Sequence, residues 1–428
     1  MKILYIAHKF WEPNTEGTLN YYSSLFSEVK KYHSIQILIP IKKQLIDRFA
    51  ETKNIILMPI SYTVNPDARF PIYHSNSLFN RKFEHKFRLT IEQYQPEIIH
   101  FQHLLGFPFS LIEIANKSNI PVLITIHDFW TICPRIHLYD ANEQICRDPQ
   151  NGLICFTCVK KKMRMNVNLK NLPRDIFFSK DRRKNFFVKR YNYVVSLLKQ
   201  INRIIVPSRF VKDVYSQIGI DTKKISVLPH GLNLSDSKKE AKNQNEKMIF
   251  GYVGGIHKHK GIHDLIKAFT AVNQKRAELV IYGEGNLRWL KGYIPQTELS
   301  YVKVKGLFDA SEKAKIYQSM DYVIIPSRCY ETFSFVIREA FHYGVPAIAP
   351  DHSVFLEIIK DGQNGFLFHQ LNWHSLADVL NNVISRKIKI SSRNIKTTTP
   401  TLKEHIDNLF AIYESLLNKN ERVINNTG

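Results

Sequence analysis

The stretch DYVIIPSRCYETFSFVIREAFHYGVPAIAPD, residues 321–351, decides the fold. It begins with a short apolar run, passes through a polar loop into FVIREAFHYG, and ends with a second apolar run. A strand, a helix and a strand in this order predict a parallel βαβ unit. Two carboxylates, Glu331 and Glu339, stand eight residues apart in the loop and the helix. The unit therefore carries polar groups close to the end of its first strand.

The rest of the chain repeats this alternation. Short apolar runs separated by loops or helical patterns predict strands at 1–7, 35–41, 55–60, 97–103, 122–128, 201–208, 224–231, 248–255, 277–285, 301–306, 321–327 and 345–351. Such a pattern is typical of doubly wound parallel sheets. We expect an α/β protein of two Rossmann-like domains that face a central cleft.

Composition shifts indicate the domain boundaries. We expect a first domain at 1–234, with a cysteine-bearing and basic insert at about 133–203, and a linker at 235–247, where SDSKKEAKNQNEKM lacks apolar periodicity. A second domain follows at 248–400. Residues 401–428 predict a C-terminal helix, with one apolar face, that returns to the first domain.

Length and composition exclude several classes. A chain of 428 residues with 44% hydrophobic content is too long for one ordinary core and too apolar for global disorder. The apolar runs are far shorter than the roughly 18 residues that a membrane span requires. The N-terminus, MKILYIAHKFW, lacks the pattern of a signal peptide. These features predict a cytoplasmic protein.

The charge is strongly positive, with 60 Lys and Arg against 38 Asp and Glu. Residues 160–203 contain 14 Lys and Arg but only two acids, and they are interleaved with Phe177, Phe178, Phe186, Phe187, Tyr191 and Tyr193. This pattern fits either a solvated helical face or peripheral binding to an anionic membrane surface, which would be the inner face of the membrane. No nucleic-acid partner is expected, because no nucleic-acid module accompanies the charge.

Several motifs together resemble a known family. The segments VGGIHKHKGIHDLIKAF, VIYGEG, VKVKG, DYVIIPSRCYETFSFVIREAFHYGVPAIAPD and EIIKDGQNGFLF are similar, in this order, to the nucleotide-sugar domain of retaining glycosyltransferases with the GT-B fold. The first half matches more loosely, through ITIHDFW and VPSRFVKDVY. The resemblance is to the group 1, or family four, type. It implies that the first domain holds the acceptor and the second the donor.

The resemblance assigns the two carboxylates to different parts of a nucleotide sugar. It implies that Glu331 contacts the donor sugar and that Glu339 accepts bonds from the ribose diol. Eight residues span about 12 Å along a helix, too far for a pair that shares one proton. The backbone amides of Phe333, Ser334 and Phe335, at the start of the helix, suit the diphosphate. Ser334 stands where the family more often has glycine or proline.

Lys260 resembles the family lysine that stabilises the departing nucleoside diphosphate. Gly255 stands where the family commonly has an arginine, so another donor must replace it or the diphosphate is held less tightly. His127 ends the strand VLITIHD, and the resemblance places it near the donor sugar and the acceptor; a core histidine is the alternative. Gly17, in EGTLNYY, matches a glycine of the first loop, where backbone can approach phosphate closely.

Four cysteines cluster in the insert, at Cys133, Cys146, Cys155 and Cys158. Their spacing could close a structural four-thiolate zinc site, less readily an iron–sulfur cluster, or they could remain unligated thiols. A subset of related glycosyltransferases has a similar insert after HDFW. No D-x-D triplet occurs, which agrees with catalysis that needs no divalent metal.

We therefore expect a retaining transferase that moves a hexose from a UDP- or GDP-sugar to a hydroxyl acceptor, either a glycan or a lipid-linked molecule, in bacterial surface polysaccharide synthesis. A glycosyl phosphorylase or another sugar-phosphate enzyme on the same fold is one alternative. A non-catalytic protein that binds sugar nucleotides is another. Glu331, His127 and Lys260 are the expected catalytic residues.

Overall fold

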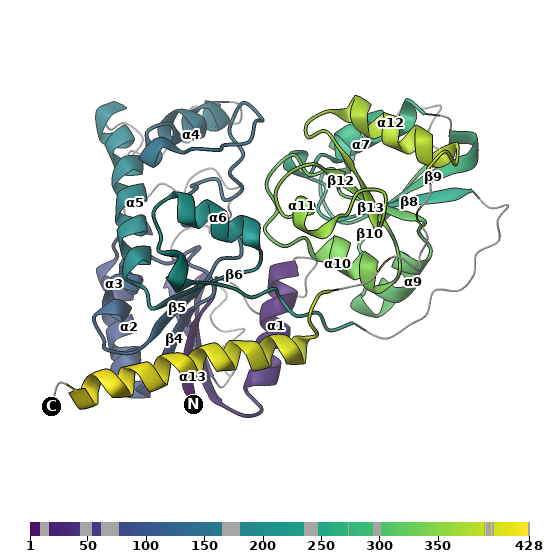
Figure 1. Ribbon diagram of the computed structural model, residues 1–428. Coiled ribbons are helices and arrows are strands. Elements are labelled where there is room, and N and C mark those ends of the chain that lie inside the picture. The colour runs from purple at the N-terminus through teal and green to yellow at the C-terminus, as the bar shows by residue number, and fades with distance from the viewer. Residues whose placement is uncertain are drawn as a thin grey trace. The chain divides into compact units, whose positions relative to one another are not determined.

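The computed structural model describes residues 1–8, 17–42, 54–60, 77–164, 180–234, 247–272, 274–293, 301–388, 390, 395 and 398–426 (Figure 1). The chain forms two compact units. The first comprises Met1–Glu12, Thr18–His230 and Leu402–Gly428, and the second comprises Pro13–Gly17 and Gly231–Thr401. Most of the predicted linker, 235–247, lies outside the described residues.

The first unit is built on a seven-stranded parallel sheet in the order β3-β2-β1-β4-β5-β6-β7. Its strands are β1 (Lys2–Ile6), β2 (Ser34–Lys42), β3 (Ile55–Ile60), β4 (Ile98–Phe101), β5 (Val122–Thr125), β6 (Arg203–Val206) and β7 (Ile225–Val227). All seven strands predicted for this half are confirmed, with shifted ends. The central strands β4 and β5 are buried throughout, as expected for strands covered on both faces.

Among the described residues, six helices follow the strands of this sheet, and a seventh lies near the end of the chain. They are α1 (Gly17–Val29), α2 (Arg81–Tyr94), α3 (Ser110–Asn116), α4 (Cys155–Arg164), α5 (Lys180–Gln200), α6 (Arg209–Gln217) and α13 (Leu402–Asn426), with short 3-10 turns at η4 (Gln150–Gly152) and η7 (Thr222–Lys224). The packing is amphipathic: α1, for example, buries Leu25, Phe26 and Val29 on one face.

The C-terminal helix α13 belongs to the first unit, as predicted (Figure 1). Leu409 and Tyr413 of α13 are buried. The Tyr413 hydroxyl lies 2.7 Å from His100 Nδ1 and 3.1 Å from the Tyr5 hydroxyl. Because these partners lie on β4 and β1, the last helix is bonded to the centre of the first sheet.

The second unit has a six-stranded parallel sheet in the order β10-β9-β8-β11-β12-β13. Its strands are β8 (Met248–Val253), β9 (Ala277–Tyr282), β10 (Val302–Gly306), β11 (Tyr322–Ile324), β12 (Ala347–Pro350) and β13 (Gly365–Phe368). This is the strand order of a dinucleotide-binding Rossmann sheet. The two sheets together confirm the predicted GT-B architecture of two Rossmann-like domains.

Helices cover both faces of this sheet, with α7 and α12 on one side and α9 and α10 on the other (Figure 1). The helices are α7 (Ile262–Thr270), α8 (Leu287–Lys291), α9 (Lys313–Gln318), α10 (Phe335–His342), α11 (Phe355–Ile358) and α12 (Trp373–Ile384), with 3-10 turns at η8 (Lys258–Lys260), η9 (Gln274–Arg276) and η11 (Ala310–Glu312).

One strand was not predicted. β13 is only four residues long and pairs in parallel with β12. It begins at Gly365, where an added Cβ would lie 2.4 Å from the Ala347 carbonyl oxygen. A run as short as GFLF carries no periodic signal, so only its pairing with β12 defines it.

None of the helices within the described ranges combines the length and the apolar character needed to cross a membrane.

Candidate active site

The strand order of the second sheet places its switch point between β8 and β11. Ligands of doubly wound sheets bind outside the carboxyl ends of the strands at this point. Lys260 follows β8 and Glu331 follows β11. Their side chains meet there, with Lys260 Nζ 2.7 Å from Glu331 Oε1. The structure therefore brings together two of the predicted site residues from segments about seventy residues apart.

The electrostatics of this site favour the charged form of Lys260. Burial lowers the pKa of Lys260, but the Glu331 carboxylate and Cys329 more than offset that effect, so the pKa lies well above its usual range. The lysine is half-buried and the carboxylate more so, with 31% and 17% of their side chains exposed. A cation held this way is available to an anionic ligand that competes with Glu331.

A tight turn delivers Lys260 to the site. It ends η8, and Gly261 follows in the left-handed region with φ +70°. A Cβ on Gly261 would lie 1.8 Å from the Pro326 carbonyl oxygen, so only glycine fits. The Arg328 amide also donates to the His259 carbonyl at 2.9 Å. The loops after β8 and β11 are thereby joined through their backbones.

The position of Glu331 is fixed by residues that the sequence did not single out. The Ser327 hydroxyl donates to Glu331 Oε1 at 2.6 Å, and the Glu331 amide donates to Ser353 Oγ at 3.3 Å. His352 Nε2 donates to the Ser327 carbonyl at 3.1 Å. Ser353 and His352 follow β12, the next strand of the sheet, and this position at a strand end is the signal that could have identified them.

Glu339 is also paired. Its Oε1 lies 2.5 Å from Lys313 Nζ, and its Oε2 accepts a bond from the Tyr317 hydroxyl at 2.7 Å. Lys313 and Tyr317 are one turn apart on α9. Burial, and then the Glu339 charge, raise the pKa of Tyr317 well above its usual range, so its hydroxyl is a permanent donor. Because α10 begins at Phe335, Glu339 lies about one turn into the helix and Glu331 precedes it, so the two carboxylates are not separated by eight helical residues.

The residues between the two carboxylates form a strained helix start. Ser334 has φ +56°, a conformation that costs a non-glycine residue about 1–2 kcal/mol. Phe333 is held by Arg338, whose Nε donates to the Phe333 carbonyl at 3.1 Å and whose guanidinium lies 4.1 Å from the ring centroid. Phe335 begins α10, and its ring lies 4.8 Å from that of Phe333. Diphosphate binding by these amides stays a prediction.

Gly255 and Gly17, the two glycines predicted for the site, lie in different elements. Gly255 follows β8, and an added Cβ there would lie 2.8 Å from the His257 ring. The Tyr252 hydroxyl donates to the Gly255 carbonyl at 2.7 Å. Gly17 is the first residue of α1. The imidazole of His257 thus occupies the space into which a larger side chain at position 255 would extend.

In the first unit, His127 follows β5 and is buried. Its Nε2 lies 2.9 Å from Gln102 Oε1, and its Nδ1 lies 3.2 Å from His230 Nε2. Burial, and then the neighbouring His230, lower the pKa of His127 well below its usual value. His127 is therefore a neutral imidazole with a protein partner on each nitrogen. Gln102 and His230, which follow β4 and β7, were not predicted from the sequence.

The carboxylate next to His127 belongs to a second pair. Asp128 Oδ2 lies 2.9 Å from His103 Nε2, and Asp128 Oδ1 accepts the Trp130 amide at 2.8 Å. The Leu105 amide donates to His103 Nδ1 at 3.0 Å, so the proton of this ring is on Nε2 and points at the carboxylate. These bonds fix the loop that follows β5.

The cysteines of the insert interact electrostatically with one another but are not arranged as ligands. Among the residues that the structure describes, no group of three or more His, Cys, Asp or Glu is placed to hold a metal ion. Cys133, Cys146, Cys155 and Cys158 are all free thiols. Burial, and then Cys133, raise the pKa of both Cys146 and Cys155 to about 12. Arg135 Nη1 donates to Cys158 Sγ at 3.5 Å. A zinc ion would require these sulfurs to move together.

Part of the basic, aromatic segment is explained by packing. Phe187 and Tyr191 of α5 are buried, and so is Arg190. The Arg190 guanidinium donates to the carbonyls of Thr131 and Trp130 and lies over the Trp130 ring at 4.7 Å. These side chains support the loop after β5 and are not available to a membrane surface. Phe177 and Phe178 lie outside the described residues.

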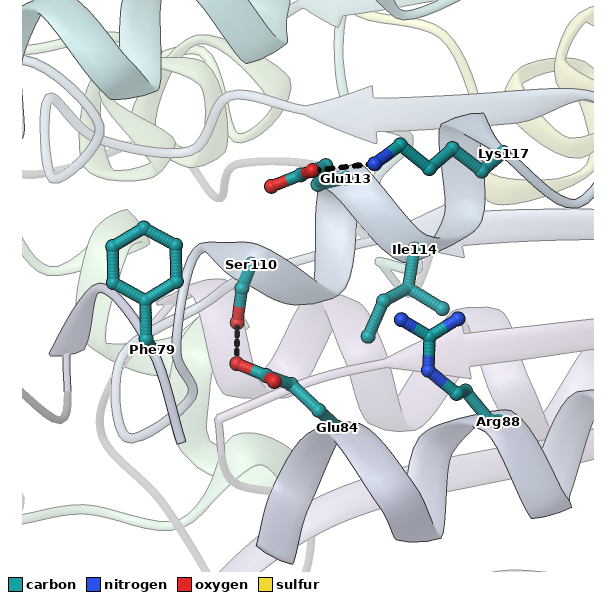
Figure 2. Close-up of a pocket in the computed structure, with 7 residues that line it drawn as sticks. All are labelled: Phe79, Glu84, Arg88, Ser110, Glu113, Ile114 and Lys117. Carbon is teal, nitrogen blue, oxygen red and sulfur yellow. Dashed lines mark hydrogen bonds and ion pairs between the residues drawn. The ribbon is translucent and has the colours of Figure 1, made fainter. Parts of the chain in front are cut away.

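A pocket in the first unit lies between α2 and α3 (Figure 2). Its carboxylates already have partners: Glu84 accepts a bond from Ser110 at 2.6 Å, and Glu113 pairs with Lys117 at 2.7 Å. The pocket contains none of the predicted site residues, and we assign it no ligand.

Comparison with known proteins agrees with this geometry. A family model described as Glycosyltransferase Family 4 matches residues 49–236, and one described as Glycosyl transferases group 1 matches residues 235–399. The chain is 24% identical over 386 residues to the alpha-monoglucosyldiacylglycerol synthase of Streptococcus pneumoniae, which covers 86% of this chain and 75% of that protein. It is 23% identical over 208 residues to the capsular polysaccharide biosynthesis glycosyltransferase CapM of Staphylococcus aureus, covering 45% of this chain and 52% of CapM.

Another relative, an uncharacterized 41.2 kDa protein in the cps region of Klebsiella pneumoniae, is 27% identical over 201 residues, or 45% of this chain and 55% of that protein. The chain thus spans about half the length of two of these curated relatives. Among solved structures, the lipopolysaccharide outer core galactosyltransferase WaaB superposes with a TM-score of 0.62 at 15% identity, covering 97% of this chain and 100% of that one.

Anabaena HepE in complex with UDP superposes with a TM-score of 0.58 at 14% identity, covering 100% of this chain and 99% of that one. The structural likenesses support the fold, and the two family models, which together span residues 49–399, support the family. The chain belongs to the group 1 glycosyltransferases.

Proposed function

We propose that this chain transfers a hexose from a nucleoside diphosphate sugar to a hydroxyl acceptor, with retention at the anomeric carbon. The observation that carries the proposal is the Lys260–Glu331 pair at the switch point of the second sheet. A lysine there can stabilise the charge that develops on a departing diphosphate, and a carboxylate beside it can accept bonds from sugar hydroxyls. HepE, a structural neighbour, has been solved with UDP and with UDP-glucose, which supports a UDP-sugar as donor.

In the proposed reaction each carboxylate recognises one part of the donor. Glu331 contacts the sugar, and Glu339 accepts bonds from the ribose diol. Lys260 binds the diphosphate, with help from the amides of Phe333, Ser334 and Phe335 at the start of α10. No step requires a divalent metal, because cationic and amide donors carry the charge of the leaving group.

The acceptor is proposed to be a glycan or a lipid-linked molecule in bacterial surface polysaccharide synthesis. The names of the relatives, a capsular polysaccharide glycosyltransferase and a glycolipid synthase, support this choice. The basic segment 160–203 supports peripheral binding to an anionic membrane on the cytoplasmic side. Sedimentation with liposomes tests this: we expect more protein to pellet with anionic than with neutral lipid, and equal pelleting would remove the electrostatic argument.

A panel of UDP-, GDP- and ADP-sugars, tested for binding and then for hydrolysis, examines the donor. We expect binding and slow turnover of at least one UDP- or GDP-sugar. Turnover that depends on inorganic phosphate and not on a nucleotide would favour a phosphorylase, and binding without turnover would favour a non-catalytic protein. If no nucleotide sugar binds, the proposal is wrong. The configuration of the product, read by NMR, tests retention.

A structural zinc on Cys133, Cys146, Cys155 and Cys158 stays a prediction. One zinc per chain in the purified protein, lost in Cys133→Ser, would support it. Substoichiometric zinc and iron would leave free thiols.

A further inference from the structure

The contacts of His127 determine where its proton lies. An amide oxygen can only accept a hydrogen bond, so the 2.9 Å contact with Gln102 Oε1 requires a proton on His127 Nε2. In the neutral ring, Nδ1 is then an acceptor. The His230 atom 3.2 Å from His127 Nδ1 is Nε2, which must carry a proton in order to donate this hydrogen bond. Both imidazoles thus carry a proton on Nε2, and His127 is neutral.

The orientation of the Gln102 amide is supported from its other side. Gln102 Nε2 lies 3.4 Å from His100 Nδ1, which also receives the Tyr413 hydroxyl at 2.7 Å. His100 Nε2 lies 2.8 Å from the Thr125 hydroxyl. With the His100 proton on Nε2, its Nδ1 accepts, so the amide nitrogen of Gln102 faces His100 and the oxygen faces His127. This assignment makes the Gln102 amide a donor toward His100 and an acceptor toward His127.

The orientation of His230 is supported by the C-terminal helix. His405 Nδ1 lies 2.8 Å from the Pro229 carbonyl, which can only accept, so His405 carries its proton there. Its Nε2 then accepts the Tyr21 hydroxyl at 2.8 Å. The Tyr21 ring lies 4.3 Å from the His230 ring and 5.4 Å from the His127 ring. Helix α13 therefore holds both the backbone next to His230 and the ring that packs on it.

We propose that Gln102 and His230 are positioning residues that hold His127 as the neutral, Nε2-protonated tautomer, so that His127 does not remove the proton of the acceptor hydroxyl. The role in catalysis rests on the proposed function; the tautomer does not. The one lone pair on the ring, at Nδ1, is already taken by His230. The groups that face the ring are Tyr21, Tyr22, Gln102, His230, His103, His8 and His100. Protonation would place a charge among these buried aromatic and imidazole groups, which disfavours it.

The tautomer is measured directly by long-range ¹H–¹⁵N NMR of the full chain, with the His127 signals assigned from their loss in His127→Gln. We expect the pattern of a neutral ring protonated at Nε2 from pH 8 down to pH 6. Gln102→Glu replaces a neutral acceptor by a carboxylate, which should raise the pH at which His127 titrates by about one unit or more. Gln93→Glu, the same change at an exposed position of α2, should leave the titration unchanged. A charged ring in the unmodified protein, or one protonated at Nδ1, would overturn the inference.

Activity gives the second readout. Gln102→Leu should lower kcat by about tenfold to a hundredfold, the cost seen when a partner that orients a metal-bound histidine is removed. The KM for the nucleotide sugar should change less than twofold. His230→Gln keeps an N–H donor and should retain more of kcat than His230→Leu. Equal losses in these two variants would show that the donor to Nδ1 is irrelevant. If the proposed function itself is wrong, the unmodified protein will turn over no nucleotide sugar while the NMR pattern still holds.

Discussion

Replacing Lys260 tests the candidate site most directly. In Lys260→Gln the cation 2.7 Å from Glu331 is lost. Two unit charges about 4 Å apart interact by about 4 kcal/mol at an effective dielectric constant of 20. Loss of the Glu331 pair in the free protein offsets part of the lost attraction for the diphosphate. We therefore expect a net loss of about 2–3 kcal/mol in transition-state stabilisation, or about 30-fold to 160-fold in kcat/KM.

The assay is steady-state turnover of the best nucleotide sugar, with the Kd for the nucleoside diphosphate measured by calorimetry. The matched control is Lys258→Gln, which removes an exposed lysine from the same 3-10 turn. It should change kcat/KM by less than threefold. The free energy of unfolding of Lys260→Gln should fall by only about 1–2 kcal/mol, because Glu331 keeps the Ser327 hydroxyl at 2.6 Å. Equal effects of the two substitutions on kcat/KM would refute the assignment of Lys260.

Three further predictions concern backbone strain and pH. Gly261→Ala should lower the free energy of unfolding by more than about 2 kcal/mol, because its Cβ would lie 1.8 Å from the Pro326 oxygen; a stability unchanged in urea denaturation would contradict this. Ser334→Gly should raise that free energy by about 0.5–1 kcal/mol, since φ +56° then carries no penalty; a decrease would show that the strain is absent. Burial lowers the pKa of His100 to about 3 and that of His405 to about 4. Because these histidines bind protons in the unfolded chain at a higher pH than in the folded protein, the free energy of unfolding should fall as the pH drops below about 6.5. Each histidine should contribute about 1.4 kcal/mol per pH unit down to its folded pKa, and a slope unaltered in His405→Gln would oppose this account.

The sequence predicted which loops hold the candidate site residues, because parallel sheets place polar loops at one edge. Lys260 and Glu331 were assigned from the resemblance to the family, and His127 from that resemblance and its place at a strand end. The structure has the strands that precede all three residues, and their roles stay predictions. The residues that bond these side chains were not predicted from the sequence, because they come from distant segments of the chain. Nothing in the run KAKIYQ shows that Lys313 and Tyr317 will meet Glu339, about two dozen residues later. For Cys133 and its neighbours the spacing alone suggested a zinc site; no group of metal ligands is assembled among the described residues, and the zinc stays a prediction.

Both carboxylates assigned to the donor are paired with lysines, Glu331 with Lys260 and Glu339 with Lys313. In each pair the lysine holds Oε1 of the carboxylate and competes there with a sugar or ribose hydroxyl. A diphosphate provides the lysines with an alternative anion, which frees the carboxylates for hydroxyls. In this account, recognition of the diphosphate and recognition of the two rings are coupled, because a lysine moves from carboxylate to phosphate. A free sugar or a nucleoside offers no such anion, so its hydroxyls would have to compete with the lysines for these carboxylates. The two lysine–glutamate pairs thus give the proposed site a preference for an intact nucleotide sugar over its separate parts.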